Sequence, residues 1–304
     1  MQYNNTKMKP RFSPSEVASL LNQNPYKSKN ETLLKILTYL PQFKDVVLDV
    51  KKTFGAKTDR EVVNSATPAS LNAMYKSVNM SVSATSDSQM EKAIDTFKKE
   101  HIKQVIQETV EGKRPPSSSP IVREMVNNIK EGKSTLEEAC SHSEVVSHIQ
   151  ATQEHKVLSS EIQKRRGIHL EDKAENNYAQ ETGIEVTNRN SVIQFECPEY
   201  RMFGYLDGMQ GDKVVETKNR KRFWTTPPAY DFIQLRCYMF MKGKTNGVLL
   251  ENFPGKPPRT TEVEWDDLKW QEIHQGLCQV ANEIKEMTEE EARSIAWSIY
   301  SQTM

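Results

Sequence analysis

Acidic and basic side chains crowd one short stretch of the chain, GYLDGMQGDKVVETKNRKRFW, which is residues 204–224. The pattern predicts two strands joined by a glycine–aspartate turn. Side chains alternate between the two faces of a strand, so Glu216 and Lys218 are expected on the same face. The turn would bring Asp207, which ends the first strand, beside Glu216. Two carboxylates and an ammonium group are therefore expected to converge at a strand end.

Such a cluster suits the hydrolysis of a phosphodiester. Two carboxylates with a backbone carbonyl nearby form the oxygen-rich site that Mg2+ prefers. The ion would neutralise charge on the scissile phosphate and lower the pKa of a bound water, while Lys218 orients that water or stabilises the developing charge. The alternative is a solvated hairpin with surface ion pairs. A Glu-x-Lys triplet occurs six times in the sequence, but only the one at Glu216 lies on an expected strand.

Length and composition set limits on the kind of protein. The 304 residues are 36% hydrophobic and 27% charged, which allows a buried core in one elaborated domain or two small ones. Forty-one basic residues balance forty-one acidic ones, so affinity for nucleic acid would come from local patches. The sequence contains no apolar run of about 18 residues, and its start lacks the apolar stretch of a signal peptide. A soluble, intracellular protein without a membrane partner is expected.

The cysteines argue against a metal cluster. They stand far apart in the sequence, so neither a zinc knuckle nor an iron–sulfur cluster is expected. Buried or half-buried free thiols in a reducing compartment are the expected state of all four: Cys140, Cys197, Cys237 and Cys278.

The expected elements fall into three regions, residues 1–40, 41–150 and 151–304. The first begins a helix at Pro14, with Ser13 and Glu16 expected to form a capping box. The second is helical and lies between polar linkers. The third combines a helix ending near Gly183, a meander of short strands, a helix, two further strands and a long C-terminal helix. The expected fold is α/β, with helices flanking a mixed central β-sheet and a long helical insertion.

Four segments resemble a known family in order and content. The run GYLDG…VVETKNR resembles the divided Asp…(Asp/Glu)-x-Lys signature of the PD-(D/E)XK nuclease superfamily, and RRGIHLEDKAENNYAQETGIEV is similar to its upstream helix. The segments SPSEVASLLNQNPYKS and DFIQLRCYMFMKG resemble the N-terminal signature and the glutamine-containing helix of one branch, the YqaJ-type viral recombinases that include phage lambda exonuclease. The resemblance covers residues 11–40 and 160–252.

The resemblance implies a restriction-endonuclease-like core and assigns roles to particular residues. Mg2+, which Mn2+ can replace, is the implied cofactor. Lys218 would be the catalytic lysine, and Gln234 would support the site from its helix. The implied metal ligands are Glu171, Asp207, Glu216 and the carbonyl of Thr217.

DNA contacts are implied at both ends of the resemblance. Ser15 corresponds to a serine that helps to hold a terminal 5′-phosphate, and the first turn of a helix suits an anion. Its cationic partner is left open between Arg11, Lys7 and Lys9. Trp224 would stack on a frayed base or wedge a terminal pair, although half-buried packing explains a tryptophan at this position equally well. The other expected DNA contacts are Arg166, Arg220, Lys221, Arg222 and Tyr238.

The function expected from all this is a Mg2+-dependent exonuclease that degrades one strand of linear double-stranded DNA from its end, in the 5′-to-3′ direction, during recombination, repair or replication. A single-strand-specific exonuclease, a structure-selective endonuclease and a non-catalytic DNA-binding protein stay open as alternatives. The resemblance also implies a ring-like homotrimer and a partner that anneals or binds single strands. The insertion at 41–150 is typical of forms found in large eukaryotic DNA viruses or eukaryotic genomes, which suggests a viral protein acting in a host cell.

Overall fold

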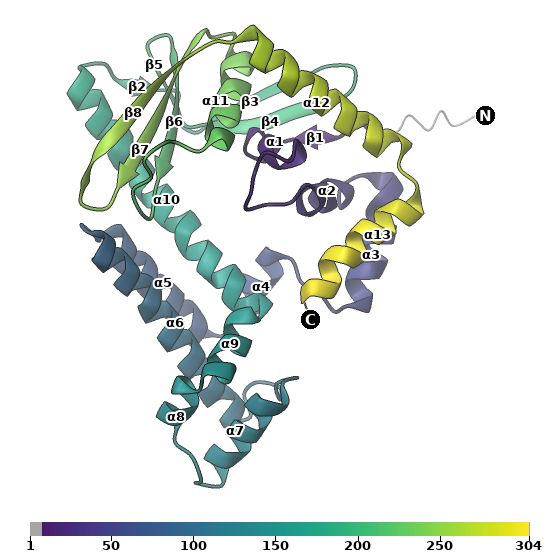
Figure 1. The fold of residues 1–304 in the computed structure, drawn as a ribbon, viewed down its shortest axis with the longest axis vertical. Helices are drawn as coiled ribbons and strands as arrows, with labels where there is room; N and C mark the ends of the chain where they lie inside the picture. Colours follow the sequence, from purple (N-terminus) through teal and green to yellow (C-terminus); the bar gives the residue numbers. More distant parts are fainter. Residues whose placement is uncertain (1–7, 304) are drawn as a thin grey trace. The chain divides into compact units, whose positions relative to one another are not determined.

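The computed structural model describes residues 8–303, which form two compact units (Figure 1). The mixed unit contains the chain up to Ala56, Glu171–Asn252 and the residues from Pro257 onward. The helical unit contains Lys57–Leu170 and the short segment Phe253–Lys256. The long helix α10, Gln153–Thr182, starts in the helical unit, and its last turns belong to the mixed unit.

The strands of the described residues lie in the mixed unit, except for the end of β7 at Phe253 and the start of β8 at Lys256. They are β1 Arg11–Phe12, β2 Val186–Thr187, β3 Ser191–Glu196, β4 Arg201–Leu206, β5 Gly208–Gln210, β6 Lys213–Asn219, β7 Asn246–Phe253 and β8 Lys256–Glu264. Its helices, besides the end of α10, are α1 Pro14–Leu20, α2 Lys29–Leu37, α3 Pro41–Thr53, α11 Ala229–Lys242, α12 Asp267–Glu286, α13 Glu289–Tyr300 and the 3-10 turn η1 Ser301–Thr303.

A five-stranded sheet in the order β2-β5-β6-β7-β8 lies between two helices. Strand β6 pairs antiparallel with β5 and parallel with β7, so the sheet is mixed. On one face, Val215 and Val248 pack against Ala174 and Tyr178 of α10. On the other face, Val214 and its neighbours pack against the Leu235, Tyr238 and Met239 side of α11. Strand β6 therefore has a helix against each of its faces.

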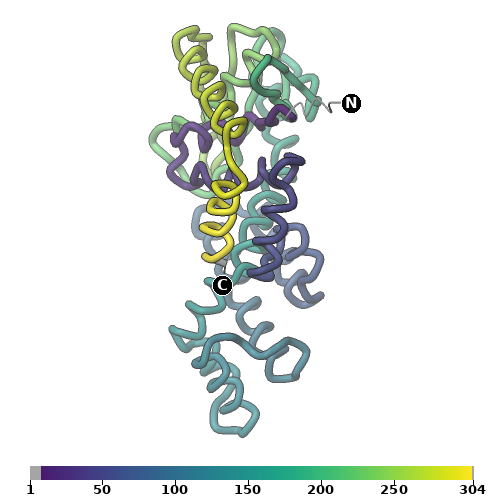
Figure 2. The backbone as a smooth tube through the Cα atoms, turned by 90° about the vertical axis from the view of Figure 1, so that its right-hand side faces the viewer, coloured from purple at the N-terminus to yellow at the C-terminus, as the bar shows by residue number. Residues whose placement is uncertain are grey.

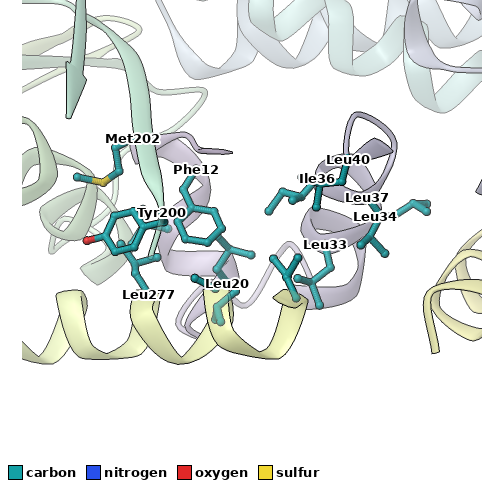
Figure 3. Packing of buried hydrophobic residues seen from close by; sticks show 14 of the residues in the cluster. Phe12, Leu20, Leu33, Leu34, Ile36, Leu37, Leu40, Tyr200, Met202 and Leu277 are labelled. Atoms are coloured by element: carbon teal, nitrogen blue, oxygen red, sulfur yellow. The ribbon is translucent and has the colours of Figure 1, made fainter. Parts of the chain in front are cut away.

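A second sheet, β1-β4-β3, is covered by helices from both ends of the chain. Phe12 and Met202 of this sheet, with Tyr200 just before β4, belong to the same core as Leu20 and as Leu277 of α12 (Figure 3). The N-terminal helices and the C-terminal α12 and α13 run beside one another (Figure 2). Because this core uses residues from both ends of the chain, the meander and the segment at residues 11–40 are held in one unit.

The helical unit is built from α4 Asp59–Ser65, α5 Pro68–Val82, α6 Asp87–Val110, α7 Pro120–Lys130, α8 Leu136–Ser141, α9 Ser143–Ala151 and the first turns of α10. Its interior contains a polar network. Fully buried His101 lies with Nδ1 3.0 Å from His155 Nδ1 and with Nε2 3.3 Å from Glu154 Oε1. Arg114 bridges Glu154 and Glu108 with N–O distances of 2.6 Å. Each charge in this network is paired, as burial requires.

The α/β fold with helices flanking a mixed sheet is confirmed. The meander differs from expectation because it is shared between two sheets: the chain leaves β4 at Leu206 and joins the other sheet at Gly208. The expected capping box is absent, because the Ser13 side chain caps no backbone amide and Glu16 pairs with Lys27 instead.

Two further expectations concern the whole chain. All four cysteines are free thiols, with Cys237 buried and the others partly exposed, as expected. Across residues 8–303, each helix is too short or too polar to cross a bilayer. Whether the divisions expected at residues 41 and 150 are true domain boundaries stays a prediction.

Candidate active site

The β5–β6 hairpin sets Asp207 beside Glu216. Gly208, which follows Asp207, pairs with Val215, which precedes Glu216. The Thr217 amide donates a hydrogen bond to Asp207 Oδ2 at 2.7 Å. Asp207 occupies the one position between β4 and β5, where the chain changes sheets. The pairing predicted from the turn is therefore present.

A close approach at Gly208 makes this bend possible. A Cβ atom at Gly208 would lie 2.4 Å from Val186 Cγ1, closer than side-chain atoms approach one another. Only glycine lets β2 pack directly onto β5 next to the aspartate. Gly208 therefore helps to fix the position of Asp207.

Glu216 and Lys218 share a face of β6, as the strand period predicts. Lys218 Nζ lies 2.5 Å from Glu216 Oε1. The same ammonium donates to Gln234 Oε1 at 3.0 Å from helix α11. The Glu216 side chain is 1% exposed, whereas that of Lys218 is 23% exposed. Lys218 is thus held by two partners and still reaches solvent.

The opposite face of β6 meets α10 through a residue that sequence reasoning missed. Thr217 Oγ1 donates to Glu175 Oε1 at 3.3 Å, and Arg189 Nε lies 3.1 Å from Glu175 Oε2. Glu175 is 1% exposed and stands one turn after the half-buried Glu171. The signal that could have found it is the spacing of four residues, which puts both glutamates on one side of a helix.

Burial and mutual repulsion disfavour the charged forms of these carboxyl groups. Burial, followed by the charge of Asp207, raises the pKa of Glu216 to about 8. Burial also raises the pKa of Asp207 to about 7 and that of Glu175 to about 7. Burial lowers the pKa of Lys218, but the charges of Glu216 and other acids outweigh it, so this pKa is raised overall. The site holds one ammonium charge against several crowded carboxyl groups.

The donor chemistry fits a divalent cation. Glu216 Oε2 is buried and has no hydrogen-bond partner, which is costly for a carboxylate unless a cation takes the oxygen. Asp207 offers a second carboxylate, whose charge acts on Glu216, and oxygen donors are what Mg2+ and Mn2+ prefer. Within residues 8–303, however, no three histidine, cysteine or acidic side chains lie in a ready-made metal-binding arrangement.

A cavity of about 280 Å3 adjoins Gln234. Ser15 and Arg11 line it, and the Ser15 hydroxyl lies 3.0 Å from that of Ser13. The Arg11 guanidinium stacks 5.4 Å from the ring centres of both Tyr39 and Phe203. Because Gln234 lines this cavity and also accepts a hydrogen bond from Lys218, the amide side chain connects the cavity with the acid cluster.

The two alternatives to Arg11 differ in placement. Lys9 bonds to Glu196 Oε1 at 2.9 Å and to the Cys197 carbonyl at 3.0 Å, and it does not line this cavity. Lys7 lies outside the described residues. Among the candidates that the structure describes, Arg11 is the one placed beside Ser15.

The expected basic patch is smaller than the sequence suggests. Arg166 belongs to the helical unit, is 3% exposed and donates to the Ser81 carbonyl, so it does not form part of an exposed patch. Arg220 donates to the buried carboxylates of Asp231 at 2.5 Å and Glu251 at 2.9 Å. Because both carboxylates are buried, one on α11 and one on the neighbouring strand β7, the arginine that pairs with them is largely withdrawn from solvent.

The remaining expected DNA contacts divide into exposed and buried groups. Lys221 and Arg222 are exposed, and Trp224 is half-buried. Tyr238 is 4% exposed and packs where the Gly204 backbone leaves room, since a Cβ there would lie 2.9 Å from the tyrosine oxygen. Tyr238 lines the cavity beside Ser15, but little of its surface is open to a ligand.

Comparison with known proteins leaves the family of the chain open. No family model and no curated protein sequence matches it. An alkaline exonuclease from Laribacter hongkongensis, LHK-Exo, aligns with a TM-score of 0.35 and 19% identity over 51% of this chain and 92% of that chain; its complex with dAMP gives the same values. The structure of SSO0001 aligns with a TM-score of 0.30 and 13% identity over 59% of this chain and 85% of that chain. Structural similarities with TM-scores and identities this low say nothing about the activity of this chain.

Proposed function

We propose that this protein is a divalent-cation-dependent nuclease that hydrolyses DNA phosphodiester bonds. The observation that carries the proposal is the convergence of Asp207, Glu216 and Lys218 on one hairpin. Surface ion pairs do not account for this arrangement, because Glu216 is buried and one of its oxygens has no partner. Carboxyl groups that lie close together destabilise a fold, so their presence here indicates that they serve a function.

The side chains divide the work of the reaction. A divalent cation held by Glu171, Asp207, Glu216 and the Thr217 carbonyl would neutralise phosphate charge and acidify water. Lys218 keeps its proton and presents a positive charge toward solvent, where it stabilises negative charge that develops on the phosphate. Gln234 positions Lys218 by accepting a hydrogen bond from its ammonium group, which also binds Glu216. Glu175 and Arg189 fasten Thr217, and with it the strand, to α10.

The dependence on a DNA end is the finer part of the proposal. The cavity lined by Arg11 and Ser15 offers a cation and a hydroxyl to a terminal phosphate, and Gln234 joins it to the acid cluster. This supports cleavage of one strand of a linear duplex from its 5′-phosphorylated end, in keeping with the sequence resemblance. A 5′-to-3′ direction, a ring-like trimer, a single-strand-binding partner and a role in recombination, repair or replication are proposed from that resemblance alone.

One experiment separates this function from its alternatives. Linear duplexes labelled at either end, with and without a 5′-phosphate, are incubated with protein and Mg2+ beside a circular duplex and a linear single strand. Release of labelled nucleotides from 5′-phosphorylated linear duplex alone is the expected result. Cutting of the circle would favour an endonuclease, preference for the single strand would favour a single-strand exonuclease, and binding without cutting would favour a non-catalytic protein.

A further inference from the structure

An aromatic cluster forms between the connection of α1 to α2 and the segment that follows β6. Tyr26, from the connection between α1 and α2, lies edge-on to Trp224 and to Tyr230, with ring centres 6.2 Å apart in both pairs. The three rings come from segments about 200 residues apart, so the fold assembles the cluster. Tyr26 is 70% exposed, although its ring contacts two aromatic neighbours.

The cluster is held in place by hydrogen bonds to its backbone. The Asn24 side chain accepts a hydrogen bond from the Tyr26 amide at 2.9 Å, which fixes the loop that presents the tyrosine. Arg259 Nη1 donates to the carbonyls of Trp224 and Thr225 at 2.7 and 2.9 Å. Arg259 is itself paired with the fully buried Glu251. The exposed ring surface is therefore presented by anchored segments.

The same segments tie the cluster to the proposed catalytic strand. Trp224 follows Lys218 by six residues. Tyr230 precedes Asp231, whose carboxylate binds the Arg220 guanidinium at 2.5 Å. Lys221 and Arg222 stand between Arg220 and Trp224 in the sequence and are exposed, so the segment that carries Trp224 also carries positive charge. An aromatic surface with adjacent cations matches a nucleic-acid strand, because bases stack on rings while phosphates attract the cations.

We infer that Tyr26 and Trp224 form a platform on which unpaired bases of a nucleic-acid strand stack. The inference rests on the proposed nuclease function for the choice of DNA as the strand. Bases within an intact duplex are already stacked on one another, so the platform discriminates in favour of unpaired nucleotides. It would hold the strand that is separated from its complement next to the acid site.

The test measures binding in the absence of cleavage. The full chain in excess chelator is titrated against a fluorescein-labelled dT12 strand and against a duplex of the same length, with fluorescence anisotropy as the readout. Tyr26→Ala is expected to weaken dT12 binding by roughly 5- to 100-fold, the range for loss of one base–aromatic stack, and to change duplex binding little. Tyr26→Phe keeps the ring and is expected to bind like the wild type. Tyr75→Ala, which removes an exposed tyrosine of the helical unit, is the matched control.

A second readout reports stacking directly. A 2-aminopurine base placed at successive positions of the strand is expected to lose fluorescence at the position that meets the platform, and to regain it with Trp224→Ala. Thermal unfolding of each variant separates loss of the ring from loss of the fold.

Three results of the binding measurements would overturn the inference. They are unchanged dT12 binding by Tyr26→Ala, equal loss on strand and duplex, and a loss by Tyr26→Phe as large as that by Tyr26→Ala. Self-association of the wild type through Tyr26, without binding of dT12, would instead make the cluster a protein contact and would also overturn it. Because the titration contains no metal, failure of the nuclease proposal would appear separately, as absence of cleavage when Mg2+ is added.

Discussion

Replacing Glu216 with glutamine should stabilise the metal-free protein at alkaline pH. Burial and the neighbouring Asp207 raise the pKa of Glu216 from 4.5 to about 8. The folded protein thus keeps a proton on Glu216 in a pH range where the unfolded chain has released it. Stability is present below about pH 4.5 and falls as the pH rises toward 8. Because each unit of pKa difference corresponds to about 1.4 kcal/mol, the lost unfolding free energy amounts to several kcal/mol above pH 8.

The assay is urea unfolding of the wild type and the Glu216→Gln variant in excess chelator from pH 5 to 9. The variant lacks the titrating group, so its advantage should be small at pH 5 and grow by about 1.4 kcal/mol per pH unit until it levels off near pH 8. The control is Glu262→Gln, which alters an exposed partner of Lys213 and should change stability by less than about 0.5 kcal/mol at every pH.

Added Mg2+ should make the wild type more stable than the Glu216→Gln variant. A cation that binds only the folded wild type stabilises it, and the variant loses part of that gain because it lacks one carboxylate. A variant that is less stable than the wild type at pH 8 to 9 in chelator, or a difference that does not vary with pH, would refute the reasoning that these carboxyl groups are crowded for a cation.

Three further outcomes follow from the same structure. Digestion of linear DNA should require Mg2+ or Mn2+, whereas Ca2+ should bind without supporting turnover, because it accepts the same oxygens with looser geometry; undiminished digestion in chelator would contradict this. Ser15→Ala should reduce the preference for a 5′-phosphorylated end by about tenfold or more, and Arg11→Ala should have the same effect. Digestion rates that do not depend on the 5′ group would contradict the role of this cavity in binding the terminal phosphate. Burial lowers the pKa of His155 to about 4, so the folded state resists its protonation. Wild-type stability should fall as the pH drops from 6.5 toward 4, and His155→Gln should flatten that part of the urea-unfolding profile; parallel profiles would refute it.

The pairing of Asp207 with Glu216 could be predicted from the sequence because it depends on local geometry. A tight turn fixes the register of a hairpin, and the two-residue period of a strand then places Glu216 and Lys218 together. The place of Gln234 at the site is less local, and the sequence resemblance supplied that expectation; its contact with Lys218 comes from the structure.

Other features could not be predicted because distant parts of the chain decide them. Which side of α10 faces the sheet depends on its packing, so Glu175 was missed although Glu171 was named. The sequence predicts Arg220 as a DNA contact, because its ion pairs with Asp231 and Glu251 become visible only in the structure. The place of Tyr26 beside Trp224 has no local signal at all.

The central claim is that Lys218 and the carboxylates beside it form a catalytic site. The most direct test compares digestion of 5′-phosphorylated linear duplex in Mg2+ by the wild type, Lys218→Ala, Asp207→Ala and the control Lys213→Ala, which removes a lysine that begins the same strand and pairs with exposed Glu262. Lys218→Ala and Asp207→Ala should lose most of the activity while their circular dichroism spectra and unfolding transitions show an intact fold, and Lys213→Ala should digest like the wild type. Wild-type rates in the Lys218→Ala and Asp207→Ala variants would contradict the claim.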